Sequence, residues 1–247
     1  GTTTAAIDGG DVDSESTVTV SAKADQLVTV FTLGGAGADK FALGGSASSN
    51  VAGGTVEARI TGGSTDVDAK GAVAVTATDD TGLEAIAGGV AFAKNKGSLA
   101  SIGAAVVNND VHRTVRAKIE GAQVDGSQVD VTATSKPSIT AGAVGGALAD
   151  KFALGGSVAL NKIANTVDAH ISGNADVTVT GGVTVRAMEL DSDRERPFLL
   201  QDLGIDVVDQ AGILAFAGGI GIGVSGAGVG AAVATNQVDS SLTAYVD

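Results

Sequence analysis

Hydrophobic and polar residues alternate with a period of two along most of the chain, which is the pattern of β-strands. In the run from Thr114 to Ile119 (TVRAKI), the residues Val115, Ala117 and Ile119 fall on one side of an extended chain, and polar or charged residues fall on the other. One face of each such strand is therefore expected in the core and the other in solvent. Because this alternation recurs along the chain, the sequence predicts an all-β protein.

The middle of the chain shows the expected elements most clearly. The pattern predicts extended segments at Leu83–Ala93, Ser98–Asn108, Thr114–Ile119, Ala122–Gly126 and Gln128–Ala133. The Gly/Ala-rich segments carry small residues on both faces. This pattern is typical of strands that are buried on both sides and packed closely against another sheet.

The elements recur as an internal repeat, which decides the fold class. An Asn followed six residues later by V-x-A-x-I, or a close variant, occurs at Asn50, Asn109, Asn161 and Asn236. A V-x-V-x-A run recurs at Val18, Val73, Val129 and Val183, at spacings of 55, 56 and 54 residues by subtraction. We therefore predict a single array forming a β-helix-like β-solenoid of about four units of roughly 55 residues. The expected units are 8–60, 61–119, 120–171 and 172–247.

One segment, 188–211, interrupts the repeat. It contains a charge cluster and Pro197, followed by Leu200, Leu203 and Val207 at helical spacing. The sequence predicts an inserted loop or a short helix there.

Composition narrows the classes of function. Among 247 residues there are 37 glycines and no cysteines, aromatic residues make up 3%, and the net charge is −13. The core must then be built from small side chains, and disulfides and Cys-ligated metals are excluded. The acidic balance argues against nucleic acid and against anionic membrane surfaces. No apolar run reads as a membrane-spanning helix, so we expect no membrane insertion.

Motifs that suggest metal binding are better explained as turns and surface charge. GGAGADKF at 34–41 matches a calcium-binding nonapeptide, but its repeat equivalent at 145–152 lacks the third Gly and no tandem copy follows. The acidic runs at 11–15 and 191–195 lack the remaining ligands of a calcium loop. His112 and His170 occupy different phases of the repeat. We predict no catalytic residue, no metal site and no cofactor.

Two columns of polar residues are the candidate structural sites. In a stacked array, Asn50, Asn109, Asn161 and Asn236 would hydrogen-bond to one another as a ladder beside a bend. On the outer face, Glu57, Arg116 and Asp168 would form a column of alternating charge that holds neighbouring units in register. The adjacent column of Arg59, Lys118 and His170 is expected to be splayed into solvent, so Arg116→Glu should cost more stability than Lys118→Glu.

The run A-G-x-V-G-G-A … G-G-S-V-A-L-N-x-I-x-N-T-V-x-A-x-I … V-T-V-x-A, fullest at 141–187, resembles the tandem repeats of very large bacterial surface adhesins, the filamentous-haemagglutinin and leukotoxin-like exoproteins. The resemblance covers nearly the whole chain except 188–211. It implies an extracellular or cell-surface, non-enzymatic module that acts as a rigid rod or spacer or in attachment. Since both ends of the chain fall at the same phase of the repeat, we expect a segment of a longer protein.

Other classes remain open. Open solenoid ends favour a self-associating extracellular fibre or matrix protein, with neighbouring repeats and homotypic end-to-end or edge contacts as partners. A polysaccharide-active β-helix would need aromatic sugar platforms, and the chain has one Tyr and six Phe. A calcium-binding β-roll would need tandem nonapeptides. A cell-surface or glycan ligand is not identified by the sequence.

Overall fold

The computed structural model describes residues 1–192 and 212–247. These residues form β-strands joined by turns, and no helix occurs among them. Every strand pairing in the described residues is parallel. The predicted all-β class is therefore confirmed, with parallel sheets.

The strands belong to two sheets. The nine-stranded sheet contains β1 (Thr2–Ser14), β3 (Phe41–Ala69), β5 (Ala100–Glu120), β6 (Gln123–Gly126), β9 (Phe152–Ile163), β10 (Thr166–Ser172), β11 (Asp176–Val179), β14 (Ala227–Val238) and β15 (Ser241–Val246). The six-stranded sheet contains β2 (Val18–Ala38), β4 (Val73–Ala93), β7 (Val129–Ser135), β8 (Ser138–Ala149), β12 (Val183–Glu189) and β13 (Ile213–Gly223).

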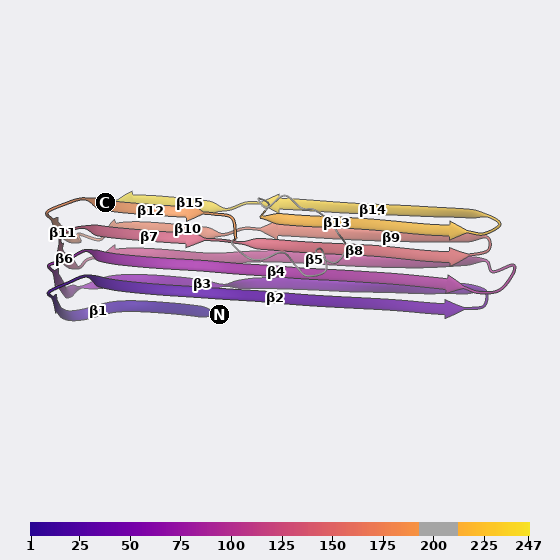
Figure 1. The fold of residues 1–247 in the computed structure, drawn as a ribbon, viewed down its shortest axis with the longest axis horizontal. Coiled ribbons are helices and arrows are strands. Elements are labelled where there is room, and N and C mark those ends of the chain that lie inside the picture. The colour runs from indigo at the N-terminus through magenta and orange to yellow at the C-terminus, as the bar shows by residue number, and fades with distance from the viewer. Residues whose placement is uncertain (193–211) are drawn as a thin grey trace.

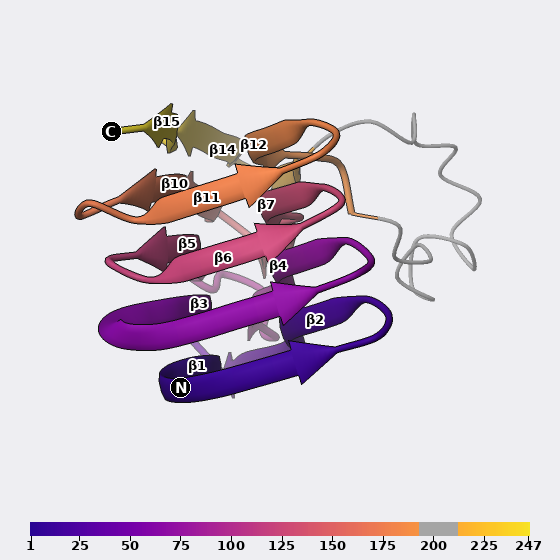
Figure 2. The same ribbon diagram turned by 90° about the vertical axis from the view of Figure 1, so that its left-hand side faces the viewer.

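Parallel pairing brings equivalent residues of the sequence motifs side by side. Val115 of β5 pairs with Val56 of β3 on one side and with Val167 of β10 on the other, and β10 continues the sheet to β15. The chain thus passes through both sheets repeatedly, and each pass, called a layer below, lies on the one before it (Figure 2). The N-terminus and the C-terminus lie at opposite ends of this stack (Figure 2).

The molecule has two unlike parts along its strands (Figure 1). At one end, called the broad end, the short strands β6 and β11 of the nine-stranded sheet run across toward the six-stranded sheet and form a third wall (Figure 2), and a cluster of Val, Ile and Ala fills the interior. The V-x-A-x-I residues of β5 are fully buried there. The other part, called the flat arm, consists of residues 27–53, 82–112, 138–163 and 213–238, where the two sheets face each other without a third wall.

Small residues let the two sheets of the flat arm touch. Its interior clusters consist mainly of Ala, Val, Leu and Ile near the broad end and of Ala alone near the tip. Between these clusters, glycines of one sheet meet backbone of the other. A Cβ on Gly89 would overlap the carbonyl oxygen of Ala104, and one on Gly103 would overlap that of Gly146. The predicted core of small side chains and close backbones is therefore present.

The predicted strand boundaries are wrong in two places. β5 runs without a break through Asn109, where a bend was expected, and β4 begins at Val73 rather than at Leu83. Each of these strands is paired along its length with its neighbours in register, so local turn preferences between residues 108 and 114 do not interrupt it. The later layers do break, between β7 and β8 and between β9 and β10.

The inserted segment starts later than expected. Met188 and Glu189 belong to β12, where they pair with Thr134 and Ser135 of β7. The predicted loop or short helix falls mostly on 193–211, outside the described residues.

Candidate functional site

The four equivalent Asn residues lie together and form a hydrogen-bonded ladder through the stack. The amide nitrogen (Nδ2) of Asn50 donates to Oδ1 of Asn109 at 2.8 Å, and that of Asn109 donates to Oδ1 of Asn161 at 2.8 Å. The Nδ2 of Asn161 donates to Oδ1 of Asn236 at 2.9 Å. Every step runs in the same direction along the stack.

The ladder lies inside the flat arm rather than beside a bend. Asn109 is 1% exposed and Asn161 is 3% exposed, and Asn109 stands between the buried Val107 and Val111 of β5. A buried amide without a partner costs free energy, so a slip between layers would leave these amides unsatisfied. The ladder therefore favours one register.

The predicted charge column is only partly formed. Arg116 lies between Glu57 and Asp168 in the sheet, and its Nε is 3.3 Å from Oδ2 of Asp168. Glu57 makes its ion pairs elsewhere, with Arg59 at 3.0 Å and with Lys118 at 3.7 Å. Arg116 therefore connects two layers, β5 and β10, but does not reach the third.

The expectation that Arg59, Lys118 and His170 point into solvent is wrong. Lys118 lies between Glu57 and Glu120, 2.9 Å from the latter, and its side chain is 18% exposed. His170 contacts Asp168 at 3.1 Å and stacks on Tyr245 with ring centroids 5.0 Å apart. Side chains two positions apart on one strand lie on the same face, so charges pair diagonally as well as across the sheet.

A buried ion pair, not anticipated from the sequence, lies between the hydrophobic interior of the broad end and that of the flat arm. Arg113 places its guanidinium on Asp79, with distances of 2.7 and 2.8 Å to the carboxylate Oδ1, and Thr81 also donates to this oxygen. The Asp79 side chain is 0% exposed and the Arg113 side chain 3%. Asn165 accepts a hydrogen bond from the backbone N–H of Arg113 and donates to Ser135, which extends the network.

The alternation of the sequence contains a signal for this network. Asp79 follows Ala77 at the inward phase of β4, and Arg113 precedes Val115 at the inward phase of β5. A charged residue at an inward phase predicts a buried partner. Burial raises the pKa of Asp79, while the hydrogen bond and charge of Arg113 act against this rise.

The first acidic run, 11–15, lies on the broad end, and the second, 191–195, falls mostly outside the described residues. Asp11 and Asp13 are part of β1, not of a loop, and they pair with Asp66 and Asp68 of β3. Partial burial first, and then the neighbouring carboxylates of Asp11 and Asp125, raise the pKa of Asp66. Within residues 1–192 and 212–247 no group of His, Asp and Glu is placed to hold a metal ion. GGAGADKF spans the turn between β2 and β3.

The outer faces of the flat arm are apolar, which contradicts the expectation that its strands are buried on both sides. The large exposed side chains of its six-stranded sheet are Leu27, Phe31, Leu33, Val90, Phe92, Val144, Ile220 and Ile222, and Val224 follows in the turn after β13. Those of its nine-stranded sheet, on the opposite surface, are Phe41, Leu43, Val51, Val106, Phe152, Leu160, Val229 and Val233. The sheets touch too closely to accept such side chains inside, so these residues lie outside.

Large side chains and glycines alternate on this surface. Leu33 extends over Gly88 of the adjacent strand, and the ring of Phe216 lies over Gly142. Covering a neighbouring glycine shields its backbone and supports the strand pairing. Much of the surface stays open nonetheless, since the exposed fraction is 59% for Phe31 and 45% for Phe92.

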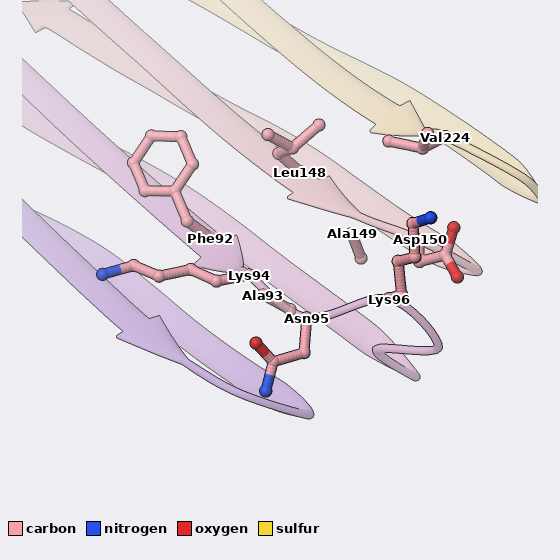
Figure 3. Close-up of a pocket in the computed structure, with 9 residues that line it drawn as sticks. All are labelled: Phe92, Ala93, Lys94, Asn95, Lys96, Leu148, Ala149, Asp150 and Val224. Carbon is pink, nitrogen blue, oxygen red and sulfur yellow. The ribbon is translucent and has the colours of Figure 1, made fainter.

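A hollow of about 430 Å³ lies at the tip of the arm (Figure 3). Phe92, Leu148 and Val224 supply apolar walls, and the turn after β4 adds Lys94 and Lys96. Hydrogen bonds from Ser225 and from the backbone N–H of Gly97 lower the pKa of Asp150, the acidic group of the hollow. Asp150 thereby connects the turn after β4, which contains Gly97, to the turn after β13, which contains Ser225.

Comparison with known protein families, curated proteins and solved structures finds no match. Among the residues that the structure describes, no helix is long and apolar enough to span a membrane. The function is therefore argued from the geometry above.

Proposed function

We propose that this chain is a structural and adhesive module of a long secreted or cell-surface bacterial protein, in which it forms a rigid β-solenoid section of a rod. The observation that carries the proposal is the in-register parallel pairing of layers from β1 through β15. A stack of this kind holds its two ends in a fixed relative position, because each layer contacts the next along the length of its strands.

Three kinds of contact resist bending between layers. Backbone hydrogen bonds join the strands, buried V-x-A-x-I residues stack in the broad end, and the Asn ladder runs through the flat arm. The buried V-x-A-x-I residues and the ladder lie in different parts of the molecule. Rotation of one layer on another would therefore have to break at least one of them, which supports a spacer role.

The flat arm is the proposed attachment surface. Contiguous exposed apolar patches rimmed by polar residues mark interaction sites on soluble proteins. The arm presents such residues on both of its outer faces, whereas the outer face of the broad end carries charged residues such as Glu57, Arg116 and Lys118. A resemblance to adhesin repeats supports the same assignment.

A tandem protein tests the rod. Two copies of the chain joined without a flexible linker should give, in small-angle X-ray scattering, a particle whose height along the stacking direction grows by about 4.8 Å for each added layer, while its extent along the strands, the longest dimension of one copy (Figure 1), stays unchanged. A single copy with an equal length of Gly/Ser sequence attached is the control. A dumbbell profile, or a cross-section that doubles, would overturn the spacer role.

Attachment is tested separately with Phe31→Ser/Phe92→Ser against Thr76→Ser/Thr132→Ser on the broad end. Beads coated with the chain should adhere to a methyl-terminated surface and to intact bacterial cells, and only the Phe variant should lose adhesion. Equal adhesion of both variants would remove the flat arm from the proposal.

A further inference from the structure

One turn at the tip of the flat arm departs from the repeat. The turns that join the two sheets there are residues 39–40, 150–151 and 224–226 in three layers, but residues 94–99, called the long turn, in the layer of β4 and β5. By subtraction the long turn has four residues more than the shortest turns. Stacking does not require these extra residues, and insertions in repeat proteins map to loops on one face, which is often the binding face.

The long turn is held against the turn of the next layer. The backbone N–H of Gly97 donates to Oδ2 of Asp150 at 2.7 Å, and the backbone N–H of Asp150 donates to the hydroxyl oxygen of Ser98 at 2.8 Å. The carbonyl oxygen of Ser98 accepts from the backbone N–H of Lys151 at 3.1 Å. Because these bonds fix the long turn on the next layer, it forms a wall of the hollow at the tip.

The hollow beside the long turn has apolar walls that are open to a ligand. Phe92 of β4 and Leu148 of β8 are paired in the sheet, and Val224 follows in the next layer. The three side chains point to the same side of their strands (Figure 3), and Val224 is 72% exposed. The volume of about 430 Å³ lies within the range of about 300–1,000 Å³ that is typical of small-molecule sites.

The charged residues of the hollow favour an anion. Lys94 and Lys96 of the long turn are exposed, and among the described side chains neither forms an ion pair. The carboxylate of Asp150 already accepts hydrogen bonds at both oxygens, from Ser225 and from Gly97. The hollow thus carries two ammonium groups and one carboxylate, whereas the chain has a net charge of −13. An anion is therefore attracted to the tip more than to the rest of the surface.

We propose that the hollow binds a single-chain anionic amphiphile, of the class of medium-chain alkyl carboxylates. Its alkyl chain lies on Phe92, Leu148 and Val224, and its head group lies beside Lys94 and Lys96. Burial of the alkyl chain supplies most of the affinity, and charge selects the head group. The proposal goes beyond the rod and the attachment surface, because it assigns a small-molecule site to one turn.

A lipid bilayer fits the same features less well. The long turn walls the hollow on one side, which suits a single alkyl chain rather than a planar surface. An anionic bilayer would also repel a chain whose net charge is −13. A bilayer would contact exposed apolar residues of the arm away from the tip, such as Phe31, whereas a molecule in the hollow would not. The contribution of Phe31 therefore distinguishes the two ligands.

Isothermal titration calorimetry with decanoate, below the concentration at which it forms micelles, tests the site. One decanoate should bind per chain. Hexanoate, which has four methylenes fewer, should bind at least about tenfold more weakly, because each fully buried methylene changes the affinity about fourfold. Decyltrimethylammonium, which has an alkyl chain of the same length but the opposite charge, should bind about fivefold more weakly than decanoate.

Charge reversal in the long turn tests the head-group contact. Lys94→Glu/Lys96→Glu should weaken decanoate binding about tenfold or more and should strengthen binding of decyltrimethylammonium. Both lysines are exposed, so the fold should persist. Lys23→Glu/Lys162→Glu, on β2 and β9 outside the hollow, makes the same change in net charge and is the control. The control should leave the affinity for decanoate within about twofold of that of the unmodified chain.

A second pair of variants tests the apolar contact. Val224→Ser, at an exposed position in the hollow, should weaken binding of decanoate and of decyltrimethylammonium alike, by about fivefold. Phe31→Ser is the control, because Phe31 is exposed on the same outer face but lies outside the hollow. This control should leave both affinities unchanged.

Three results would overturn the proposal. Decanoate could fail to bind saturably, the two charge reversals could have equal effects, or Phe31→Ser could weaken binding as much as Val224→Ser. Binding of the chain to phosphatidylglycerol vesicles without binding of decanoate would also overturn it and would assign the tip to a lipid surface. None of these results depends on the scattering profile of the tandem protein or on bead adhesion, so this proposal and the proposed function fail separately.

Discussion

Gly145 of β8 lies against the backbone of Gly156 in the facing sheet, so closely that a Cβ at 145 would fall on the carbonyl oxygen of Gly156. This contact sets the thickness of the flat arm. Because the sheets meet backbone to backbone at this point, large side chains cannot enter between them. The apolar outer surface of the arm follows from that exclusion.

We expect Gly145→Ala to lower the free energy of unfolding by about 1–3 kcal/mol or more, since overpacked interiors must shift backbone or neighbours. Gly146→Ala is the matched control, because its Cβ would point outward and meet only a methyl group of Val90 at 3.5 Å. Urea unfolding followed by circular dichroism measures both. Equal effects would show that the sheets are not in contact here.

The Asn ladder predicts a cost for removing its middle member. Asn109→Ala should destabilise the chain by about 1–3 kcal/mol, because the half-buried amide of Asn50 and the buried amide of Asn161 would each lose a partner. Asn108→Ala, one position away on the exposed face of β5, should change stability by less than about 0.5 kcal/mol. If Asn109→Ala left the free energy of unfolding unchanged, the ladder would not be a determinant of the register between layers.

Breaking the buried ion pair between Asp79 and Arg113 should lower the free energy of unfolding more than removing Asn109 from the ladder. Arg113→Met leaves the carboxylate of Asp79 buried without its cation, for which a loss of about 3–5 kcal/mol is expected. The exposed pair offers the control: Arg116→Met, whose side chain is 36% exposed, should cost about 0–1 kcal/mol. Chemical denaturation at pH 7 compares the two.

The Arg113→Met substitution should also change how the free energy of unfolding depends on pH. The folded-state pKa of Asp79 is raised above its ordinary value of 3.8, so its contribution to stability is full below that value and is lost as pH rises through the raised pKa. Removing Arg113 removes a group that lowers this pKa. The stability gap between Arg113→Met and the unmodified chain should therefore narrow from pH 7 toward pH 4, and a constant gap would contradict this.

The outer charges support a revised ranking of two substitutions. Lys118 contacts two carboxylates, Glu57 and Glu120, whereas Arg116 contacts one, Asp168. Lys118→Glu should therefore cost at least as much as Arg116→Glu, on the order of 1 kcal/mol, the reverse of the ranking expected from the sequence. Thermal unfolding at low and at high salt would compare them. A larger loss in Arg116→Glu would restore the original ranking.

Strand class and side-chain direction are predictable from this sequence because alternation reports burial directly. Val115, Ala117 and Ile119 illustrate this, since one face of β5 is buried along its length. Strand ends are less predictable, because the pairing of β5 with β3 and β9 overrides the local breaks around residues 108–114. The ladder register could be proposed from spacing alone, since equal phases of a repeat meet in a stack.

Two features of the structure could not be predicted from the sequence. The exposure of Phe31 and Phe92 depends on the distance between the sheets, which the alternation of one strand does not contain. The pairing of Asp79 with Arg113 joins residues 34 positions apart on facing sheets. A charged residue at an inward-facing position can be recognised in the sequence. Its partner cannot, because the partner depends on how the two sheets face each other.

The layered arrangement also defines how the molecule would respond to force. The termini lie at opposite ends of the stack (Figure 2), so tension between them pulls layers apart across their hydrogen bonds. The layers would then peel one at a time, releasing the 59, 52 and 75 residues that separate successive ladder positions. At about 3.3–3.6 Å per residue, each step frees roughly 170–270 Å of chain. The stack would thereby lengthen stepwise under load and absorb mechanical energy before the chain is fully stretched.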